Sequence, residues 1–214
     1  KKNRIAGNFI KINRYSYTSS AYIITDKNDN QITAFYPGSC PKNAANISLP
    51  KKISADIKMG IVSPWLDKKL IIRAVQWLAN NRIPAIFDPG QWATYFTKQE
   101  LLKILKQVQL LIGNDYEITT ILKKINTPLN KLAITKELKI ITTCGPEGSV
   151  LAENGKQYRI KKIKIKNDID PTGAGDAYRA GLLKGLLSRL TLEKAGRLAA
   201  IVALYTVEKY GTQT

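Results

Sequence analysis

The sequence predicts an α/β fold of three layers, in which a mostly parallel central sheet is covered by helices on both faces. From Ile57 onward, short apolar strand segments alternate with segments of helical period, which is typical of parallel strands joined by crossover helices. Glycine and polar residues follow the predicted strands at Asp88, Asn114, 143–148 and 170–176. Ligands bind such sheets beyond the carboxyl ends of the strands, so these loops are the candidate site.

A small hairpin is expected in front of the α/β region. Residues 21–36 contain two β-forming stretches separated by a polar turn at 26–30. Pro37 and Gly38 end the second stretch, because proline and glycine both interrupt regular structure. The hairpin is therefore predicted to be antiparallel and to precede the parallel sheet.

Local signals mark where several elements begin. Ser63 followed by Pro64 predicts a helix start, because proline is favoured at the first helical position. Thr97 and Glu100 have the spacing of a capping box and predict another. The dipeptide at 154–155, Asn-Gly, predicts a two-residue hairpin turn. The expected strands are 59–62, 83–87, 109–112, 138–142, 149–153 and 156–165, and the expected helices are 64–78, 98–105, 115–124, 177–190 and 192–208.

The most informative segment is 170–176, which reads Asp-Pro-Thr-Gly-Ala-Gly-Asp and runs into the helix expected at 177–190. Gly173 and Gly175 have no Cβ, so the backbone can turn tightly and direct its N–H groups at an oxyanion, and the helix start adds positive potential. Asp176 would repel that anion unless its task is to accept a proton from an attacking hydroxyl group. The segment predicts a phosphoryl-transfer site, with an ordinary turn and helix cap as the alternative.

Two other segments have both a structural and a functional interpretation. Asn114 and Glu117 have capping-box spacing, and a capped Glu117 can also order Mg²⁺ through water. Thr143, Gly145 and Gly148 can form a simple glycine turn. The same turn can also donate hydrogen bonds from Thr143 and the Gly145 backbone to phosphate oxygens.

In this order, the segments resemble the signatures of the ribokinase/PfkB family of sugar and nucleoside kinases. The match is most specific at 170–185, where the helix begins Ala-Tyr-Arg-Ala-Gly. Residues 114–117 resemble the family's Asn-x-x-Glu motif, and 143–148 resemble its Thr-x-Gly-x-x-Gly turn. Phe-Asp-Pro-Gly-Gln at 87–91 and Gly-Thr-Gln at 211–213 are most similar to the nucleoside-kinase branch, which includes adenosine-kinase-like enzymes.

This resemblance implies a ribokinase-like fold and an ATP-dependent kinase that transfers the γ-phosphate to a hydroxymethyl group of a nucleoside or sugar. Asp176 would be the catalytic base, and Gly173, Ala174 and Gly175 would surround the transferred phosphoryl group. The adenine would lie near residues 199–205 of the last helix. The implied nucleotide-binding residues are Asn114, Glu117, Thr143, Gly145, Gly148 and Thr172.

The implied cofactors are ATP and Mg²⁺. Glu117 would hold Mg²⁺ through water, and Asp170 is a candidate ligand of a monovalent cation, K⁺. A nucleoside or sugar is the expected partner, and a homodimer is considered as an assembly.

The sequence departs from the family pattern at its beginning. Family members open with an acceptor-binding region that contains a Gly-Gly pair, whereas no Gly-Gly dipeptide occurs here and the resemblance begins only near Phe35. We expect a single kinase domain over 1–214, N-terminally incomplete or naturally short, with 1–50 as a hairpin or lid remnant and 51–214 as the nucleotide-binding core. The other hypotheses are a catalytically silent ATP-binding remnant and a basic protein that binds polyanions or nucleic acid on the same fold.

The composition limits the chemistry. The 214 residues include no histidine, which excludes Ser-His-Asp and Cys-His nucleophile systems and nearly every zinc site. Two cysteines do not make a disulfide scaffold. No apolar run approaches the roughly 20 residues of a membrane span, so no membrane partner and a cytoplasmic location are expected.

The charge balance requires a nucleic-acid hypothesis, because 34 lysines and arginines face only 16 acidic residues and leave a net charge of +18. The lysines are scattered in pairs or alternate with isoleucine, as in 162–166. Both patterns are typical of a solvated surface. We therefore expect no dedicated nucleic-acid site.

Overall fold

The computed structural model describes residues 12–25, 31–40, 47–50, 56–64, 67–129, 131–132, 138–161 and 169–211. The chain separates into two compact units, Lys1–Ile47 and Ser48–Thr214. The predicted hairpin lies in the first unit and the predicted α/β region lies in the second.

The first unit contains the antiparallel hairpin that the sequence predicts. Strands β1 (Ser20–Thr25) and β2 (Gln31–Tyr36) pair from Ser20 with Tyr36 to Thr25 with Gln31. The turn residues 26–30 lie outside the described residues. Gly38 follows the second strand with φ +52° and lies against the backbone of Tyr17, so a side chain there would be strained and would collide with the carbonyl oxygen of Tyr17.

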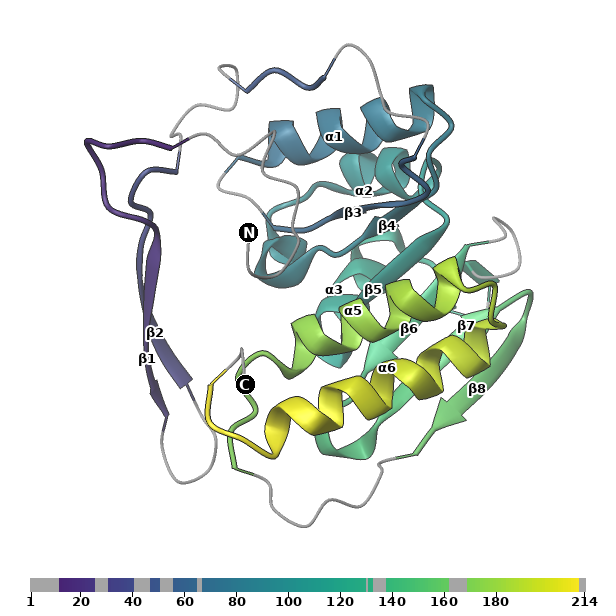
Figure 1. The fold of residues 1–214 in the computed structure, drawn as a ribbon. Helices are drawn as coiled ribbons and strands as arrows, with labels where there is room; N and C mark the ends of the chain where they lie inside the picture. Colours follow the sequence, from purple (N-terminus) through teal and green to yellow (C-terminus); the bar gives the residue numbers. More distant parts are fainter. Residues whose placement is uncertain are drawn as a thin grey trace. The chain divides into compact units, whose positions relative to one another are not determined.

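The second unit is built on a six-stranded sheet in the order β3-β4-β5-β6-β7-β8 (Figure 1). Strands β3 to β6 are parallel, and β7 and β8 are added as an antiparallel hairpin. Asn154 and Gly155 both adopt positive φ in the turn between β7 and β8, as the predicted Asn-Gly hairpin requires. The strands are β3 (Gly60–Val62), β4 (Ala85–Phe87), β5 (Leu110–Asn114), β6 (Lys139–Thr143), β7 (Ser149–Glu153) and β8 (Lys156–Ile160).

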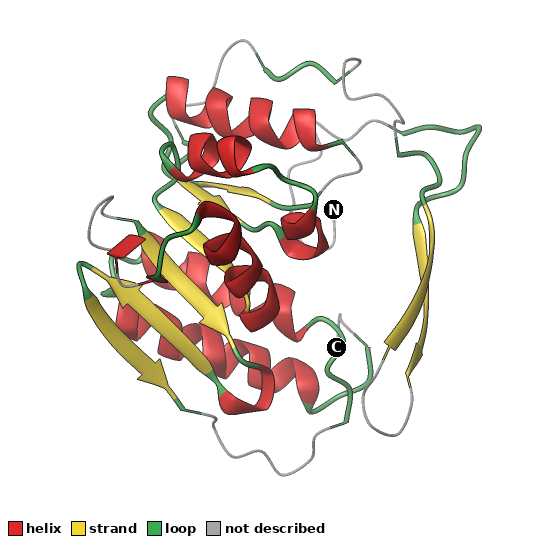
Figure 2. Cartoon of the chain, turned by 180° about the vertical axis from the view of Figure 1, so that it is seen from behind, coloured by secondary structure: helices red, strands yellow, loops and turns green. Residues whose placement is uncertain are grey.

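Helices cover both faces of this sheet, which confirms the predicted three layers (Figures 1 and 2). Because β3 to β6 are added in one direction, right-handed crossovers place α1, α2 and α3 on the same face. Helices α5 and α6 pack on the other face. The helices are α1 (Lys68–Asn80), α2 (Lys98–Leu105), α3 (Asp115–Ile125), α5 (Ala174–Leu187) and α6 (Leu192–Val207), with 3₁₀ turns η2 (Gly90–Thr94) and η3 (Gly145–Glu147).

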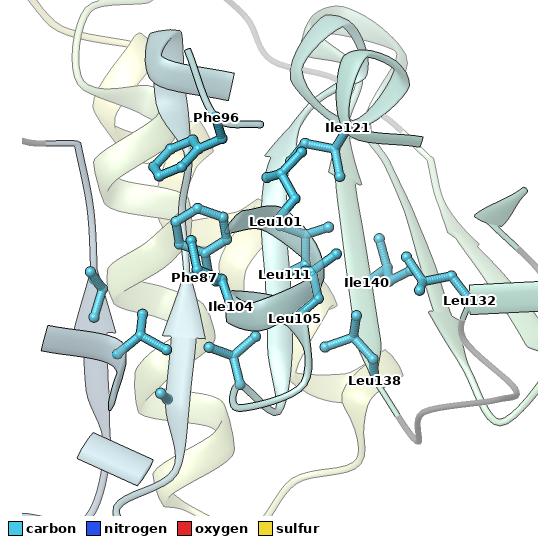
Figure 3. Packing of buried hydrophobic residues seen from close by; sticks show 14 of the residues in the cluster. Phe87, Phe96, Leu101, Ile104, Leu105, Leu111, Ile121, Leu132, Leu138 and Ile140 are labelled. Carbon is cyan, nitrogen blue, oxygen red and sulfur yellow. The ribbon is translucent and has the colours of Figure 1, made fainter. Parts of the chain in front are cut away.

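The strands are apolar on both faces because both faces are buried. Phe87 packs toward α1, α2 and α3, whereas its neighbour Ile86 packs toward α5 and α6, as strand alternation requires. The rings of Phe87 and Phe96 meet edge to face with centroids 5.8 Å apart, beside Leu101 and Ile104 of α2 (Figure 3). Each such side chain stabilises the fold by about 1.5 to 3 kcal/mol on burial, so the ends of the central strands rest on a rigid core.

Two predicted helix starts are wrong. Helix α1 begins at Lys68 rather than after Ser63, because Asp67 caps it by accepting a hydrogen bond from the Lys69 N–H at 2.8 Å. Pro64 instead packs against Gly90. Helix α5 begins at Ala174, three residues before the expected start, and ends at Leu187 rather than 190.

Other local predictions are confirmed or shortened. The capping box of α2 is present, with the Thr97 N–H donating to Glu100 Oε2 at 2.8 Å and the Glu100 N–H donating to Thr97 Oγ1 at 3.2 Å. Strand β8 ends at Ile160 rather than 165, and the lysine alternation at 162–166 lies outside the described residues. Within the part of the chain that the structure describes, no helix is long and apolar enough to cross a membrane.

Candidate active site

A cavity of about 260 Å³ lies at the end of the sheet where β6 leads into η3, beside α5 and α6. Its walls come mainly from three segments named in the sequence analysis, the glycine turn after β6, the start of α5 and the apolar residues of α6, and Lys161 after β8 adds to them. The lining residues are Thr143, Gly145, Pro146, Gly148, Lys161, Pro171, Ala174, Gly175, Tyr178, Ala200, Ala203, Leu204 and Val207.

The α6 side of the cavity is an apolar wall, called the apolar slot below. It consists of Ala200, Ala203, Leu204 and Val207, which offer no polar side-chain atom. This segment overlaps the residues 199–205 that were expected to lie near an adenine. Slots of this kind, apolar with a few polar groups at one end, are typical of small-molecule sites.

The α6 wall is held in place by unusually close helix packing. A Cβ on Gly181 would lie 2.8 Å from the Cα of Ala199, and a Cβ on Gly185 would lie 2.8 Å from the Cα of Ala195. Real Cβ atoms do not make contacts that short, so α5 and α6 can approach this closely only where α5 carries glycine. The position of the apolar slot relative to the start of α5 therefore depends on these two glycines.

Two of the four cavity-lining residues at the turn after β6 are glycines, which can present only backbone. Gly145 has φ +50° and Gly148 has φ +92°, a region that favours glycine. The Cys144 N–H donates to the Gly148 carbonyl at 2.8 Å and closes the turn. Thr143 lines the cavity, and its hydroxyl group lies 3.4 Å from the Gly113 carbonyl as a weak donor.

The start of α5 has the polarity of an anion site. Gly173 precedes the helix in the left-handed conformation with φ +85°, and no side chain caps the helix. Among the described residues, the backbone N–H groups of Gly175 and Asp176 have no hydrogen-bond partner. Unpaired N–H groups and the helix dipole together favour an oxyanion there. Asp176 is exposed in this first turn.

The expected reason for Gly175 is wrong. Gly175 lies inside the helix and is not among the glycines with positive φ, so it does not make a tight turn. A Cβ at this position would instead lie 2.7 Å from Nη1 of Arg179. A guanidinium group therefore passes across the surface of this glycine, and a side chain at position 175 would have to displace it.

Asp170 fastens the loop before α5 to the residues that follow α6. Its Oδ1 accepts from the Thr172 N–H at 2.9 Å, and its Oδ2 accepts from the Gly211 N–H at 3.1 Å. The hydrogen bonds from Thr172, and then the one from Gly211, lower the pKa of Asp170. The Ile169 and Asp170 N–H groups also donate to the Val207 carbonyl, at 2.9 and 3.2 Å. A monovalent cation at Asp170 stays a prediction.

The Asn114 and Glu117 pair forms the capping box of α3. The Glu117 N–H donates to Asn114 Oδ1 at 2.8 Å, and the Asn114 N–H donates to Glu117 Oε2 at 2.8 Å. Burial raises the pKa of Glu117. The hydrogen bond from Asn114 and the charge of Arg179 lower this pKa, and the Asp88 carboxylate raises it further. Among the described residues, no group of three or more acidic or cysteine side chains is placed to hold a metal ion.

A buried ion pair that the sequence analysis missed connects the sheet to α5. Asp88, which directly follows β4, is 4% exposed, and its Oδ2 lies 2.5 Å from Nε of Arg179. Asp88 Oδ1 also accepts from the Gly90 N–H at 3.2 Å, so Asp88 stabilises the turn that follows β4 as well. The sequence carries no signal for this pair, because its two residues lie far apart in the chain.

The predicted residues therefore fall into two groups around the cavity. Thr143, Gly145, Gly148, Ala174 and Gly175 line it, whereas Asn114, Glu117, Asp170, Thr172, Gly173 and Asp176 are not among its lining residues. Together they define an α/β protein in which an uncapped helix start lies next to an apolar slot.

Comparison with known proteins assigns this α/β protein to a family. The sequence model of the pfkB family carbohydrate kinases matches residues 1–214, and the chain belongs to this family. A nucleoside kinase of Methanocaldococcus jannaschii is 34% identical over 197 residues, which cover 92% of this chain and 63% of that protein. The chain therefore spans less than two thirds of this relative's length.

Solved structures agree on the fold. The crystal structure of Methanocaldococcus jannaschii nucleoside kinase, described as an archaeal member of the ribokinase family, has a TM-score of 0.82 at 32% identity and matches 93% of this chain and 64% of that one. Burkholderia thailandensis nucleoside kinase in complex with ADP-inosine has a TM-score of 0.80 at 31% identity and matches 93% of this chain and 61% of that one. The fold is ribokinase-like, as the resemblance implied.

Proposed function

We propose that this chain carries the nucleotide-binding and phosphoryl-transfer apparatus of an ATP-dependent nucleoside kinase. The observation that carries the proposal is the cavity whose apolar slot leads to the unpaired N–H groups of Gly175 and Asp176. An adenine fits the apolar α6 wall, and the phosphates fit the N–H groups of the α5 start. A γ-phosphoryl group at that position lies beside Asp176, the candidate base.

The charge of the transferred group would be stabilised by backbone donors rather than by side chains. The N–H groups of Gly175 and Asp176 are held in place by the helix, so they need no reorganisation as negative charge develops. Mg²⁺, when bound, neutralises the phosphates and usually keeps several of its own waters. The buried carboxylate of Glu117 fits such a role through water, and its hydrogen bond from Asn114 fixes its orientation.

The acceptor is proposed to be a nucleoside. The relatives from Methanocaldococcus jannaschii and Burkholderia thailandensis are nucleoside kinases, and the second was solved in complex with ADP-inosine. A sugar stays the alternative acceptor. The hydroxymethyl group would approach Asp176, which would take its proton as the phosphoryl group arrives.

Asp176→Asn tests this proposal, because an amide keeps the shape of the side chain but cannot accept the proton. We expect ADP affinity within about twofold of wild type and a loss of turnover of at least about 100-fold, the contribution typical of a general base. Calorimetric titration with ADP and nucleoside-dependent ADP release from ATP measure the two quantities. Glu193→Gln, which neutralises an acid on α6 outside the cavity lining, is the control.

The alternative hypotheses give different results in the same assays. ADP binding without turnover by the wild-type chain would favour a silent nucleotide-binding remnant. Absence of ADP binding, together with strongly salt-dependent binding to DNA or RNA, would favour the polyanion hypothesis. Retention of more than about a tenth of the wild-type rate by Asp176→Asn would exclude Asp176 as the base.

A further inference from the structure

The guanidinium group of Arg179 lies directly on the anion-binding start of α5. Nη1 would be 2.7 Å from a Cβ on Gly175, so the group crosses the surface of that glycine. Among the described residues, the backbone N–H of Gly175 has no hydrogen-bond partner. The arginine side chain is 20% exposed, which leaves part of its surface open to a ligand.

Asp88 holds this guanidinium group from the side of the sheet. The Asp88 side chain is 5% exposed, and its Oδ2 is in ion-pair contact with Nε of Arg179. The buried Nε has no hydrogen bond of acceptable direction, so the contact is electrostatic. Among the described residues, Nη1 and Nη2 have no hydrogen-bond partner either. Asp88 therefore orients Arg179 while the Nη1 and Nη2 groups, the fork of the guanidinium, remain available to a ligand.

The position of Arg179 relative to the cavity indicates what the fork can reach. Gly175 lines the cavity, whereas Arg179 and Asp176 do not. Asp176 and Arg179 are three residues apart on α5 and share a helix face. A phosphoryl group that leaves the cavity toward Asp176 must pass Gly175, and it would there meet the guanidinium group.

We propose that Arg179, oriented by Asp88, is a second phosphate-binding group of this site and contacts the terminal phosphate of the nucleotide, the one that is transferred. This inference rests on the proposed function. The planar fork of arginine matches two phosphate oxygens, which a backbone N–H alone cannot do. Asp88 is a positioning residue, because it acts on the phosphate only through Arg179.

The test compares two nucleotides that differ in the terminal phosphate. ADP and a non-hydrolysable ATP analogue are titrated by calorimetry, with Mg²⁺, into wild type and Arg179→Met, whose side chain keeps much of the apolar stem. We expect ADP affinity within about twofold of wild type and analogue affinity at least about tenfold lower, the size of one hydrogen bond to a charged group. Arg197→Met, at an exposed arginine of α6, is the matched control for loss of one positive charge.

Several outcomes would overturn the inference. Equal losses for ADP and the analogue would make Arg179 a structural brace of α5, and no loss for either would remove it from the site. If the methionine variant no longer binds ADP, Arg179→Lys is titrated with both nucleotides instead, because lysine keeps the positive charge but lacks the two-pronged guanidinium group. A phosphate contact then predicts a severalfold loss for the analogue alone, and unchanged affinities for both nucleotides contradict it. Wild type that binds neither nucleotide would instead refute the proposed function itself.

A double-mutant cycle tests the role of Asp88. In the wild-type background, Asp88→Asn should lower the affinity for the analogue more than the affinity for ADP. In the Arg179→Met background it should not lower the affinity for the analogue further, because Asp88 acts on the phosphate through Arg179. An additional loss in the double variant would show that Asp88 acts independently and would refute the positioning role.

Discussion

Replacing Gly181 by alanine should destabilise the protein although alanine is the better helix former. The added Cβ would lie 2.8 Å from the Cα of Ala199 and 3.0 Å from the Cβ of Val202 on α6. Overpacking of this kind costs about 1 to 3 kcal/mol, and the helix-propensity gain offsets only about 0.8 to 1.0 kcal/mol. The net loss of up to about 2 kcal/mol corresponds to a fall in Tm of up to about 8 °C for a chain of this size.

Thermal unfolding followed by circular dichroism measures this change, and calorimetry with ADP measures its effect on the site. ADP affinity should fall as well, because Ala200 and Ala203 of the displaced α6 line the cavity. Lys184→Ala, at an exposed position of α5, should change neither the Tm nor the ADP affinity appreciably. A Tm above that of wild type for the Gly181 variant would refute the reasoning, since helix propensity alone predicts a gain of about 2 to 4 °C.

Three further substitutions test other contacts. Thr97→Ala removes one half of the α2 capping box and should cost about 1 kcal/mol in urea unfolding; an unchanged midpoint would mean that the cap contributes nothing. Tyr178→Phe leaves the buried Ser149 hydroxyl group, 2.9 Å from the tyrosine oxygen, without its partner and should cost about 1 to 3 kcal/mol, whereas the double variant with Ser149→Ala should recover part of this loss. Glu117→Gln should be at least as stable as wild type at pH 8, because burial raises the pKa of Glu117 and disfavours its charged form. The stability advantage of the variant should shrink as the pH falls through this raised pKa, because wild-type Glu117 then becomes neutral. An advantage that grows toward low pH would contradict the raised pKa.

Features that depend on adjacent residues could be predicted from the sequence. The capping box at Thr97 and the hairpin turn at Asn154 are local arrangements in which the side chain or backbone that decides the structure lies within a few residues. The three-layer fold also follows from local patterns, because the spacing of apolar residues predicts each buried strand and each helix.

Features that depend on competing helix caps, or on contacts between residues far apart in the chain, could not be predicted from the sequence. The start of α1 was misplaced because Ser63 and Asp67 are both good caps, and tertiary packing of Pro64 on Gly90 decides between them. The start of α5 was misplaced because a backbone conformation, the left-handed Gly173, begins the helix without a side-chain cap. The pair of Asp88 and Arg179 joins segments that are far apart in the chain, and one sequence shows no signal that connects them.

The hydrogen bonds that connect the loop before α5 to the end of α6 make the two ends of the cavity mechanically dependent. The Ile169 and Asp170 N–H groups share the Val207 carbonyl, and Asp170 also receives the Gly211 N–H. Val207 itself belongs to the apolar slot. A flat ring bound in the slot would therefore restrain the loop that leads to the proposed phosphate site, before any phosphate is bound. Adenosine and a phosphate, added together, should accordingly bind with positive cooperativity, because the first of them reduces the conformational entropy that the second must still lose.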